Sequence, residues 1–281
     1  MPAAATLLRP LRCIAAALTA AWTLAGPVPA LAQGDLLVAP TRVVLSGGGT
    51  AEVILSNIGE KSATYRIALE LRRMSPEGDL DDVTEPEANV TEQAALGMVR
   101  YAPRRITLAP NQPQAVRISA RPGAELPDGE YRVHMSFRAI PDPTAVEDAP
   151  ASPEGGFQIR LTPIYGVTIP VIVRKGQLEA TAGIANPGVV RNADGTFLSL
   201  DLTRQGARSV FGEVVVSARG IKEPVYVARG IGVYPEIGKR SLMLPLSPEQ
   251  VARLKGPVRI EYREMPENGG RLIAAIDTSI G

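Results

Sequence analysis

Hydrophobic and polar residues alternate with a period of two along most of the chain. The longest such segment is 157–174, FQIRLTPIYGVTIPVIVR, in which every odd-numbered residue is apolar and the even-numbered residues are mixed. This alternation is typical of a β-strand with one buried face. Since an ordinary strand has about 5–6 residues, the pattern predicts an unusually long strand whose apolar face needs a cover.

Shorter alternating segments, separated by turn residues, occupy both halves of the chain. In the first half they are 36–45, 50–57, 62–74, two segments within 99–122, and 130–141. In the second half they are 178–185, 197–204, 212–219, 224–234, 239–246, 258–264 and 271–279. This spacing predicts an all-β protein of two Ig-like β-sandwich domains, 33–175 and 176–281, joined by a short hinge around 174–177.

A few segments depart from the strand pattern. The acidic stretch 74–92 and the Pro- and Ala-rich stretch 142–156 are predicted loops, and the three glycines at 47–49 predict a hairpin turn. One helix is expected at 247–254. Ser247 would be its N-cap, and Gln250 would complete a capping box.

The first 32 residues have the features of a secretory signal peptide. Arg9 and Arg12 precede an uncharged apolar run that ends in an A-x-A pattern at 30–32, so we expect cleavage after Ala32. A retained membrane anchor is the alternative, but one glycine and two prolines interrupt the run and favour cleavage. No later stretch is long and apolar enough to span a bilayer, so membrane insertion is not expected.

Composition argues against an enzyme or a nucleic-acid-binding protein. Without residues 1–32, 28 basic and 29 acidic residues remain, a net charge of −1, which provides no basic field for nucleic acid. The one cysteine, Cys13, lies in the expected leader, which excludes cysteine nucleophiles and cysteine metal sites. The one histidine, His134, shares a strand face with Arg132 and Arg138 and is expected at the surface. No catalytic group, metal or cofactor is therefore predicted.

The two prolines of segment 157–174 indicate that this strand is not paired along both sides. Pro163 and Pro170 lack N–H donors, and their odd separation removes one donor from each side of the strand. An edge strand with exposed apolar side chains needs a cover. That cover is either the protein's own sandwich or a partner that accepts the strand. We expect both, with 167–173 in the core and 157–165 available to a partner.

Several segments resemble the periplasmic pilus-assembly chaperones, the PapD-like family. They are VAPTRVVLSG (38–47), RRITLAPNQPQAVRIS (104–119), GEYRVHMSFRAIP (129–141), IPVIVR (169–174) and, in the second half, ENGGR (267–271). No single motif is diagnostic, but their order and spacing extend over nearly all of 33–281. The ending PVIVR at 170–174 is similar to that of a divergent branch of the family.

The resemblance implies a non-enzymatic periplasmic chaperone without a cofactor. Such proteins bind pilin-like subunits by donor-strand complementation, prevent premature polymerisation, and deliver the subunits to an outer-membrane usher. The positions that match the donor strand are Phe157, Ile159, Leu161, Pro163 and Tyr165. The exposed apolar edge also favours a self-capping dimer of the free protein.

Further residues are implied by position. Arg42 matches the arginine that binds the C-terminal carboxylate of the subunit, although on sequence alone a solvated arginine is the simpler interpretation. The lysine that accompanies this arginine in well-known members is replaced by Pro170. Arg117, Glu130 and Glu267 match an ion-pair set that fixes the interdomain geometry, the alternative being three unrelated surface charges.

A second class of function stays open at this point. Two Ig-like domains in an exported protein also suit a structural or adhesive protein without chaperone activity. Capture of a pilin-like subunit, and its loss on substitution within 157–165, would distinguish the two.

Overall fold

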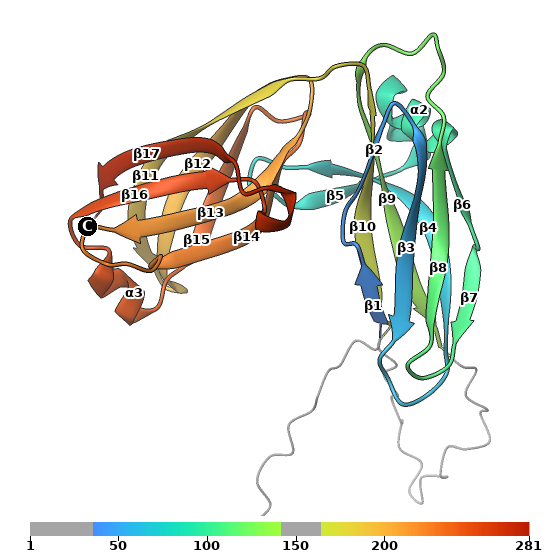
Figure 1. The fold of residues 1–281 in the computed structure, drawn as a ribbon, viewed down its shortest axis with the longest axis horizontal. Coiled ribbons are helices and arrows are strands. Elements are labelled where there is room, and N and C mark those ends of the chain that lie inside the picture. Colours follow the sequence, from blue (N-terminus) through green and yellow to red (C-terminus); the bar gives the residue numbers. More distant parts are fainter. Residues whose placement is uncertain (1–35, 142–163, 281) are drawn as a thin grey trace, which may run out of the picture. The chain divides into compact units, whose positions relative to one another are not determined.

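The computed structural model describes residues 36–141 and 164–280, and these residues form two β-sandwiches (Figure 1). The strands of the first are β1 (Leu36–Ala39), β2 (Val43–Ser46), β3 (Gly49–Asn57), β4 (Ala63–Met74), β5 (Leu80–Val83), β6 (Val99–Ala102), β7 (Arg105–Leu108), β8 (Pro113–Ala120), β9 (Gly129–Ile140) and β10 (Gly166–Lys175). One sheet has the order β1-β3-β8-β6 and the other the order β2-β10-β9-β4-β5, with β7 paired to β4. The all-β, two-sandwich prediction is confirmed.

The second sandwich is built from a three-stranded and a four-stranded sheet. Its strands are β11 (Ala180–Asn192), β12 (Gly195–Gly206), β13 (Val210–Ala218), β14 (Tyr226–Val233), β15 (Lys239–Pro245), β16 (Pro257–Arg263) and β17 (Leu272–Ser279). The sheet orders are β11-β12-β15 and β14-β13-β16-β17. Among the described residues, no strand of β1–β10 pairs with one of β11–β17. A domain boundary at 175/176 between these two sets remains our proposal.

Each sandwich has its own apolar core, filled by the inward-facing residues of its two sheets. Fully buried side chains of the first core include Leu55, Leu108, Ile118, Met135, Phe137 and Ile169. Those of the second include Leu198, Leu200, Leu202, Leu254 and Tyr262. Burial of such side chains is the main driving force for both folds, since the chain has no cysteine after Cys13.

The predicted strand 36–45 is two strands that belong to different sheets. β1 pairs with β3, whereas β2 pairs with β10, and Pro40 lies between them. A proline has no N–H for a sheet ladder, so it suits the crossing between sheets. The glycines at 47–49 have positive φ and form a turn as expected. The turn links β2 to β3 in the opposite sheet, so the hairpin prediction is wrong.

A helix within the first sandwich was not predicted. α2 spans Val90–Met98, after β5 and the 3₁₀ turn η1 (Glu85–Glu87), so the expected loop 74–92 is partly structured. Asn89 caps α2, because its side chain accepts from the Glu92 N–H while the Glu92 carboxylate accepts from the Asn89 N–H. This N-x-x-E capping box was the available sequence signal.

One short element of the second half agrees with the sequence prediction, and a 3₁₀ turn was not predicted. α3 spans Pro248–Arg253, with Ser247 and Gln250 forming the predicted capping box. η3 spans Pro266–Asn268. In the predicted hinge, Gly176 has φ of 80°, a conformation that glycine adopts at little cost.

Asn57 holds the end of β3 through three hydrogen bonds, which gives a test of the first sandwich. Its fully buried amide donates to the carbonyls of Lys61 (2.7 Å) and Leu108 (3.0 Å), and its Oδ1 accepts from Gly59 N–H (2.9 Å). We predict that Asn57→Asp lowers the free energy of unfolding by about 2–5 kcal/mol, because a carboxylate would face two carbonyls. Urea denaturation of the chain from residue 33 measures this effect.

The matched control for this substitution is Asn111→Asp, which makes the same chemical change at an exposed turn residue. Its unfolding midpoint should stay close to that of the original chain. Equal midpoints for the two variants would contradict the role given to Asn57.

Candidate functional site

Within the described residues, strand β10 has a neighbouring strand along its full length on one side only. β9 pairs antiparallel with it from Gly166 to Lys175, whereas β2 pairs parallel with it only from Val171 to Arg174. Among the described residues, the backbone of 166–170 therefore has no strand partner on the side away from β9 (Figure 1). This incomplete pairing is what the proline spacing predicts. We call residues 166–170 of β10 the open edge.

Two hydrogen bonds fix the direction in which the backbone groups of β10 point. The Ala139 N–H donates to the Tyr165 carbonyl (2.9 Å), and the Gly47 N–H, after β2, donates to the Arg174 carbonyl (2.7 Å). Because successive residues of a strand point to opposite neighbours, odd-numbered residues of β10 bond β9 and even-numbered ones face the β2 side. Gly166 and Thr168 thus direct their N–H and carbonyl groups to the open edge. Pro170 faces the same way, where its missing N–H costs the ladder nothing.

The inward side chains of β10 belong to the core of the first sandwich. Ile169, Val171 and Val173 are fully buried, and Val167 packs against the same cluster. This confirms the prediction that 167–173 is covered by the protein itself. Tyr165, just before the strand, is 45% exposed. The other predicted donor-strand residues, Phe157, Ile159, Leu161 and Pro163, lie outside the described residues.

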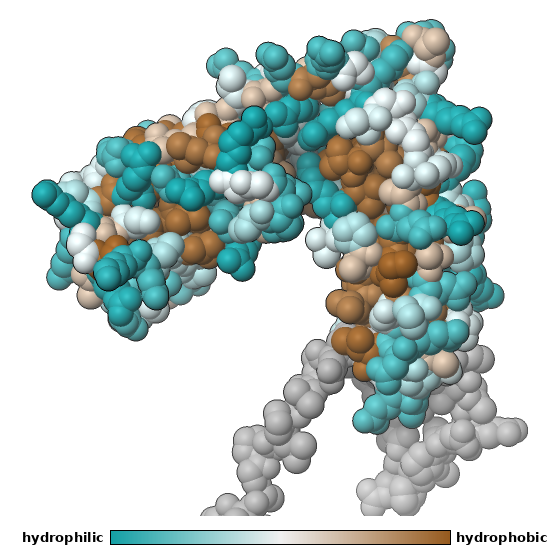
Figure 2. Space-filling view, in the orientation of Figure 1, coloured by the Kyte–Doolittle hydropathy of each residue, from teal (hydrophilic) through white to brown (hydrophobic). Residues whose placement is uncertain are grey.

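An apolar surface lies near the open edge. Figure 2 shows apolar side chains gathered on the face of the first sandwich that carries β1, β2 and β3. Large exposed apolar residues of these strands are Leu37, Val44 and Ile54. Exposed apolar patches of this kind often mark interaction surfaces.

The outer face of the β2-β10-β9-β4 sheet carries a row of chemically distinct side chains. Pro170 pairs in register with His134 of β9, and His134 pairs with Glu70 of β4. Arg42 immediately precedes β2, where Val43 pairs with Val171. If that register is continued by one residue, Arg42 lies beside Pro170. Register partners project from the same face of a sheet, so Arg42, Pro170, His134 and Glu70 form one row across four strands.

The predicted carboxylate anchor, Arg42, is held by residues of the second sandwich. Its Nη2 donates to Ser209 Oγ (3.0 Å), and its guanidinium carbon lies 4.5 Å from the Phe211 ring centre and 5.9 Å from that of Tyr234. Burial lowers the pKa of Arg42 from its ordinary value, but an arginine stays charged at neutral pH. Its buried Nη1 has no hydrogen-bond partner among the described residues. This nitrogen can still donate to an incoming acceptor.

The predicted ion-pair set is not assembled. Arg117 pairs with Glu52 (3.0 Å) on the outer face of the other sheet, where its side chain is 82% exposed. Glu267 is exposed in η3. The prediction is wrong because β8, which carries Arg117, lies in the sheet opposite β9, which carries Glu130.

Glu130 instead joins a cluster of its own. Its Oε2 accepts from Arg174 Nε (2.9 Å) and from the N–H (3.1 Å) and Oγ (2.9 Å) of Ser209. The carboxylate is almost completely buried. Glu130 therefore connects Arg174 of β10 to Ser209, just before β13. The sequence analysis did not predict these contacts.

His134 is buried, with 1% of its surface exposed, so the expectation of a surface histidine is wrong. Its strand face is covered from above by Tyr234, whose ring centre lies 6.4 Å from that of His134 in an edge-on arrangement. Burial lowers the pKa of His134 to about 3, and the nearby charges of Arg132, Arg72 and Arg42 act in the same direction. Neither ring nitrogen has a hydrogen-bond partner among the described residues. The imidazole is therefore neutral at physiological pH.

The sequence analysis missed the segment that covers this face. Arg132 lies against the Tyr234 ring, 3.7 Å from its centre, and donates to both carboxylate oxygens of Glu236 (3.1 and 2.5 Å). Glu236 also accepts from the Met74 N–H (2.9 Å). Tyr234 and Glu236 follow β14 without any motif, so periodicity alone carried no signal for their role.

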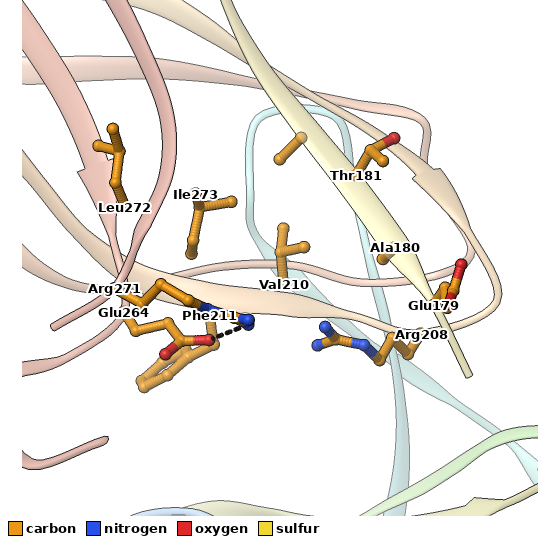
Figure 3. Close-up of a pocket in the computed structure, with 11 residues that line it drawn as sticks. Glu179, Ala180, Thr181, Arg208, Val210, Phe211, Glu264, Arg271, Leu272 and Ile273 are labelled. Carbon is orange, nitrogen blue, oxygen red and sulfur yellow. Dashed lines mark hydrogen bonds and ion pairs between the residues drawn. The ribbon is translucent and has the colours of Figure 1, made fainter. Parts of the chain in front are cut away.

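The second sandwich has a groove that contains none of the predicted site residues (Figure 3). It measures about 490 Å³, and its residues come from the start of β11, the start of β13, and the segment leading into β17. Its charged groups are largely satisfied internally: Arg271 donates to Glu264 (2.8 Å), and Arg208 Nε donates to the Leu178 carbonyl (3.1 Å). The groove is therefore a weaker candidate site than the outer face of the first sandwich.

The described residues contain neither a metal-binding cluster nor a membrane-spanning helix. No group of three or more histidine, cysteine, aspartate or glutamate side chains is arranged to hold a metal ion. No helix there has the length and apolar character needed to cross a bilayer.

Comparisons with known proteins gave structural matches only. No family model and no curated protein matches the chain. It is similar to the structure of a pre-assembly complex of CsuC with the tip adhesion subunit CsuE from Acinetobacter baumannii (10% identity, TM-score 0.47, 88% of this chain and 100% of that chain). It is also similar to the SafB chaperone–SafA pilin complex of Salmonella enterica (15%, 0.45, 88% and 97%) and the CupB2 chaperone of Pseudomonas aeruginosa (16%, 0.43, 86% and 100%).

The burial of His134 predicts a specific pH dependence of stability. Its pKa in the folded chain, about 3, lies below the ordinary 6.5, so between these values the unfolded chain binds a proton that the folded chain does not. The free energy of unfolding should therefore fall as the pH falls from about 6.5 towards 3, by at most ~1.4 kcal/mol per pH unit from this group. His134→Gln should remove that part of the slope. Urea denaturation of both chains at pH 7, 6, 5 and 4 measures it, and parallel curves would show that His134 is not buried in its neutral form.

Proposed function

We propose that the chain is a periplasmic chaperone that binds pilin-like subunits by strand addition and delivers them to an outer-membrane usher. The observation that supports this best is the open edge of β10. Its inward side chains are already covered by the core, while the N–H groups of Gly166 and Thr168 point away from β9 toward a side where the described residues place no strand. A strand edge of this kind can accept one more strand from a partner.

In this proposal, the segment that leads into the open edge recognises the subunit. Residues 157–165 continue the alternation of β10 and place an apolar side chain at every second position, ending at the exposed Tyr165. A partner whose own sandwich lacks one strand has an apolar groove of matching period. Main-chain hydrogen bonds would supply affinity, and the alternate side chains Phe157, Ile159, Leu161 and Pro163 would supply specificity.

Arg42 is proposed to bind the C-terminal carboxylate of the subunit. A guanidinium can donate two parallel hydrogen bonds to a carboxylate, and the buried Nη1 of Arg42 has no partner among the described residues. The contacts to Ser209 and Phe211 hold the guanidinium in place before the subunit arrives. Fixing the end of the subunit in this way would set the register of the added strand.

The remaining parts of the proposal concern location and release. Cleavage after Ala32 would free the chain in the periplasm, where it needs no cofactor, because the subunit is released when another strand completes its sandwich more favourably. Before a subunit binds, two copies could cover each other's exposed apolar edges.

Leu161→Glu tests strand addition directly. A charged side chain in the apolar groove of a partner costs several kcal/mol, so we predict that binding of the subunit falls by about two orders of magnitude or more. The measurement is affinity purification of the tagged chain from periplasm, with native mass spectrometry to establish a 1:1 complex with a pilin-like subunit. Gln158→Glu is the matched control, since it introduces the same charge at a polar position of the alternation and should leave the complex intact.

Thr168→Pro tests the open edge separately. It removes an N–H that faces away from β9, so the fold should survive, as judged by the urea midpoint, while the subunit is lost from the purified complex. An undiminished 1:1 complex with both Leu161→Glu and Thr168→Pro would refute strand addition here. It would then favour an exported structural or adhesive protein.

A further inference from the structure

The residue beside Arg42 in the row across the sheet cannot act as a hydrogen-bond donor. In the chaperones that this chain resembles, a lysine occupies this position and binds the subunit carboxylate together with the arginine. Here the position is Pro170, which has neither a charge nor an N–H. A second donor for a carboxylate must therefore come from a neighbouring position of the same face.

The cations at the end of β10 are already occupied. Lys175 Nζ donates to the carbonyls of Gly123 (2.9 Å), Ala124 (2.8 Å) and Leu126. Arg174 Nε donates to Glu130, and its Nη2 lies 3.4 Å from Ser209 Oγ. Neither side chain can turn towards Pro170 without breaking these bonds.

The next residue along the row is His134, and it has free hydrogen-bonding capacity. It pairs in register with Pro170, so it flanks this position on the side opposite Arg42. Both of its ring nitrogens, like Arg42 Nη1, are buried without a partner among the described residues. A buried polar group without a partner is uncommon and often marks a place where a ligand or water binds.

Arg42 and His134 are also within reach of a common ligand. Their Cα atoms are two strand spacings apart, about 10 Å, with only the short ring of Pro170 between them. Both side chains turn towards the Tyr234 ring, at 5.9 Å for Arg42 and 6.4 Å for His134. An arginine side chain is long enough to cover most of that separation, so one small planar group could accept hydrogen bonds from both side chains.

The charges around His134 favour an anion at this place. Arg132 on its own strand, Arg72 on β4 and Arg42 before β2 all act on the imidazole. Glu70, the register partner on β4, is held by Ser136 Oγ (2.7 Å), Arg72 (3.1 Å) and Arg138 (3.6 Å). Glu236 is held by Arg132. Glu130, whose charge acts on Arg42, is held by Arg174 and Ser209, so each of these carboxylates has partners of its own.

We propose that His134 donates a ring N–H to the terminal carboxylate that Arg42 binds, in the place that the lysine holds in the chaperones this chain resembles. The inference rests on the proposed function, because it assumes a carboxylate at Arg42. A neutral imidazole has one N–H and can donate it without taking up a proton. Arg42 alone then supplies the positive charge of the pair, and His134 adds one directional hydrogen bond to the carboxylate.

The single histidine of the chain makes this testable by NMR. The experiment uses the chain from residue 33 with a histidine-free tag and follows the ¹⁵N and ¹H resonances of the one imidazole, while N-acetylglycine is added as a mimic of a terminal carboxylate. We expect the imidazole resonances to shift with N-acetylglycine but not with N-acetylglycinamide at equal ionic strength. The pKa of His134 should rise on binding, because the added negative charge favours the imidazolium. Arg42→Gln should abolish both effects.

Two variants separate donation from mere packing. Binding of N-acetylglycine is followed by the backbone amide resonance of Ser209, a residue whose hydroxyl accepts a hydrogen bond from Arg42. His134→Phe keeps the ring but removes the donor and should weaken binding about tenfold or more, whereas His134→Gln retains a donor and should keep most of the affinity.

Two results would overturn the inference. One is a shift of Ser209 with no change at His134, which would leave Arg42 as the sole anchor. The other is the absence of any carboxylate-specific change at either residue. Neither result affects strand addition, which is decided separately by the co-purification of the Leu161→Glu and Thr168→Pro variants.

Discussion

The constraint on which the structure depends is that β10 is paired on both sides for only part of its length. Val171–Arg174 lies between β9 and β2, which makes this half a central strand, whereas within the described part of the chain 166–170 pairs with β9 alone. The half-pairing is possible because the chain between β1 and β2 crosses from one sheet to the other at Pro40. A single alternating segment can thereby complete the core with one half and present backbone donors and acceptors with the other.

Binding of a carboxylate also requires that the charged side chains on the outer face of the first sandwich stay in place. Residues of the second sandwich hold them. Tyr234 and Glu236 cover Arg132 and His134, and Ser209 joins Arg42 to Glu130. Buried charges contribute little net stability, and their value lies in fixing one geometry. Arg42 is accordingly held by a hydroxyl and by aromatic rings. Neither carries a negative charge, and the nearby Glu130 carboxylate is bonded to Arg174, so the guanidinium keeps its affinity for an anion.

Sequence periodicity predicted most of the fold because burial on one face of a strand is a local pattern. The two-sandwich organisation, the packing of 167–173 in the core and the α3 capping box all follow from residue spacing. Relations between sheets are not local, so the crossing at Pro40 and the placement of Arg117 opposite Glu130 were missed. His134 shows the same limit: its strand face is polar, yet the residue is buried, and its ring contacts Tyr234, which is distant in the sequence.

Pro170 belongs both to the open edge of β10 and to the row of side chains that contains Arg42 and His134. Its missing N–H falls on the side of β10 where β2 has not yet begun, so the residue limits pairing within the chain without disturbing β9. A lysine there would restore that N–H and place a second cation beside Arg42. The positive charges of Arg72 and Arg132 in this region already lower the pKa of His134. A neutral donor next to a single buried arginine avoids this repulsion. The exchange of lysine for proline is therefore consistent with an anchor in which one residue carries the charge and its neighbour provides a hydrogen bond.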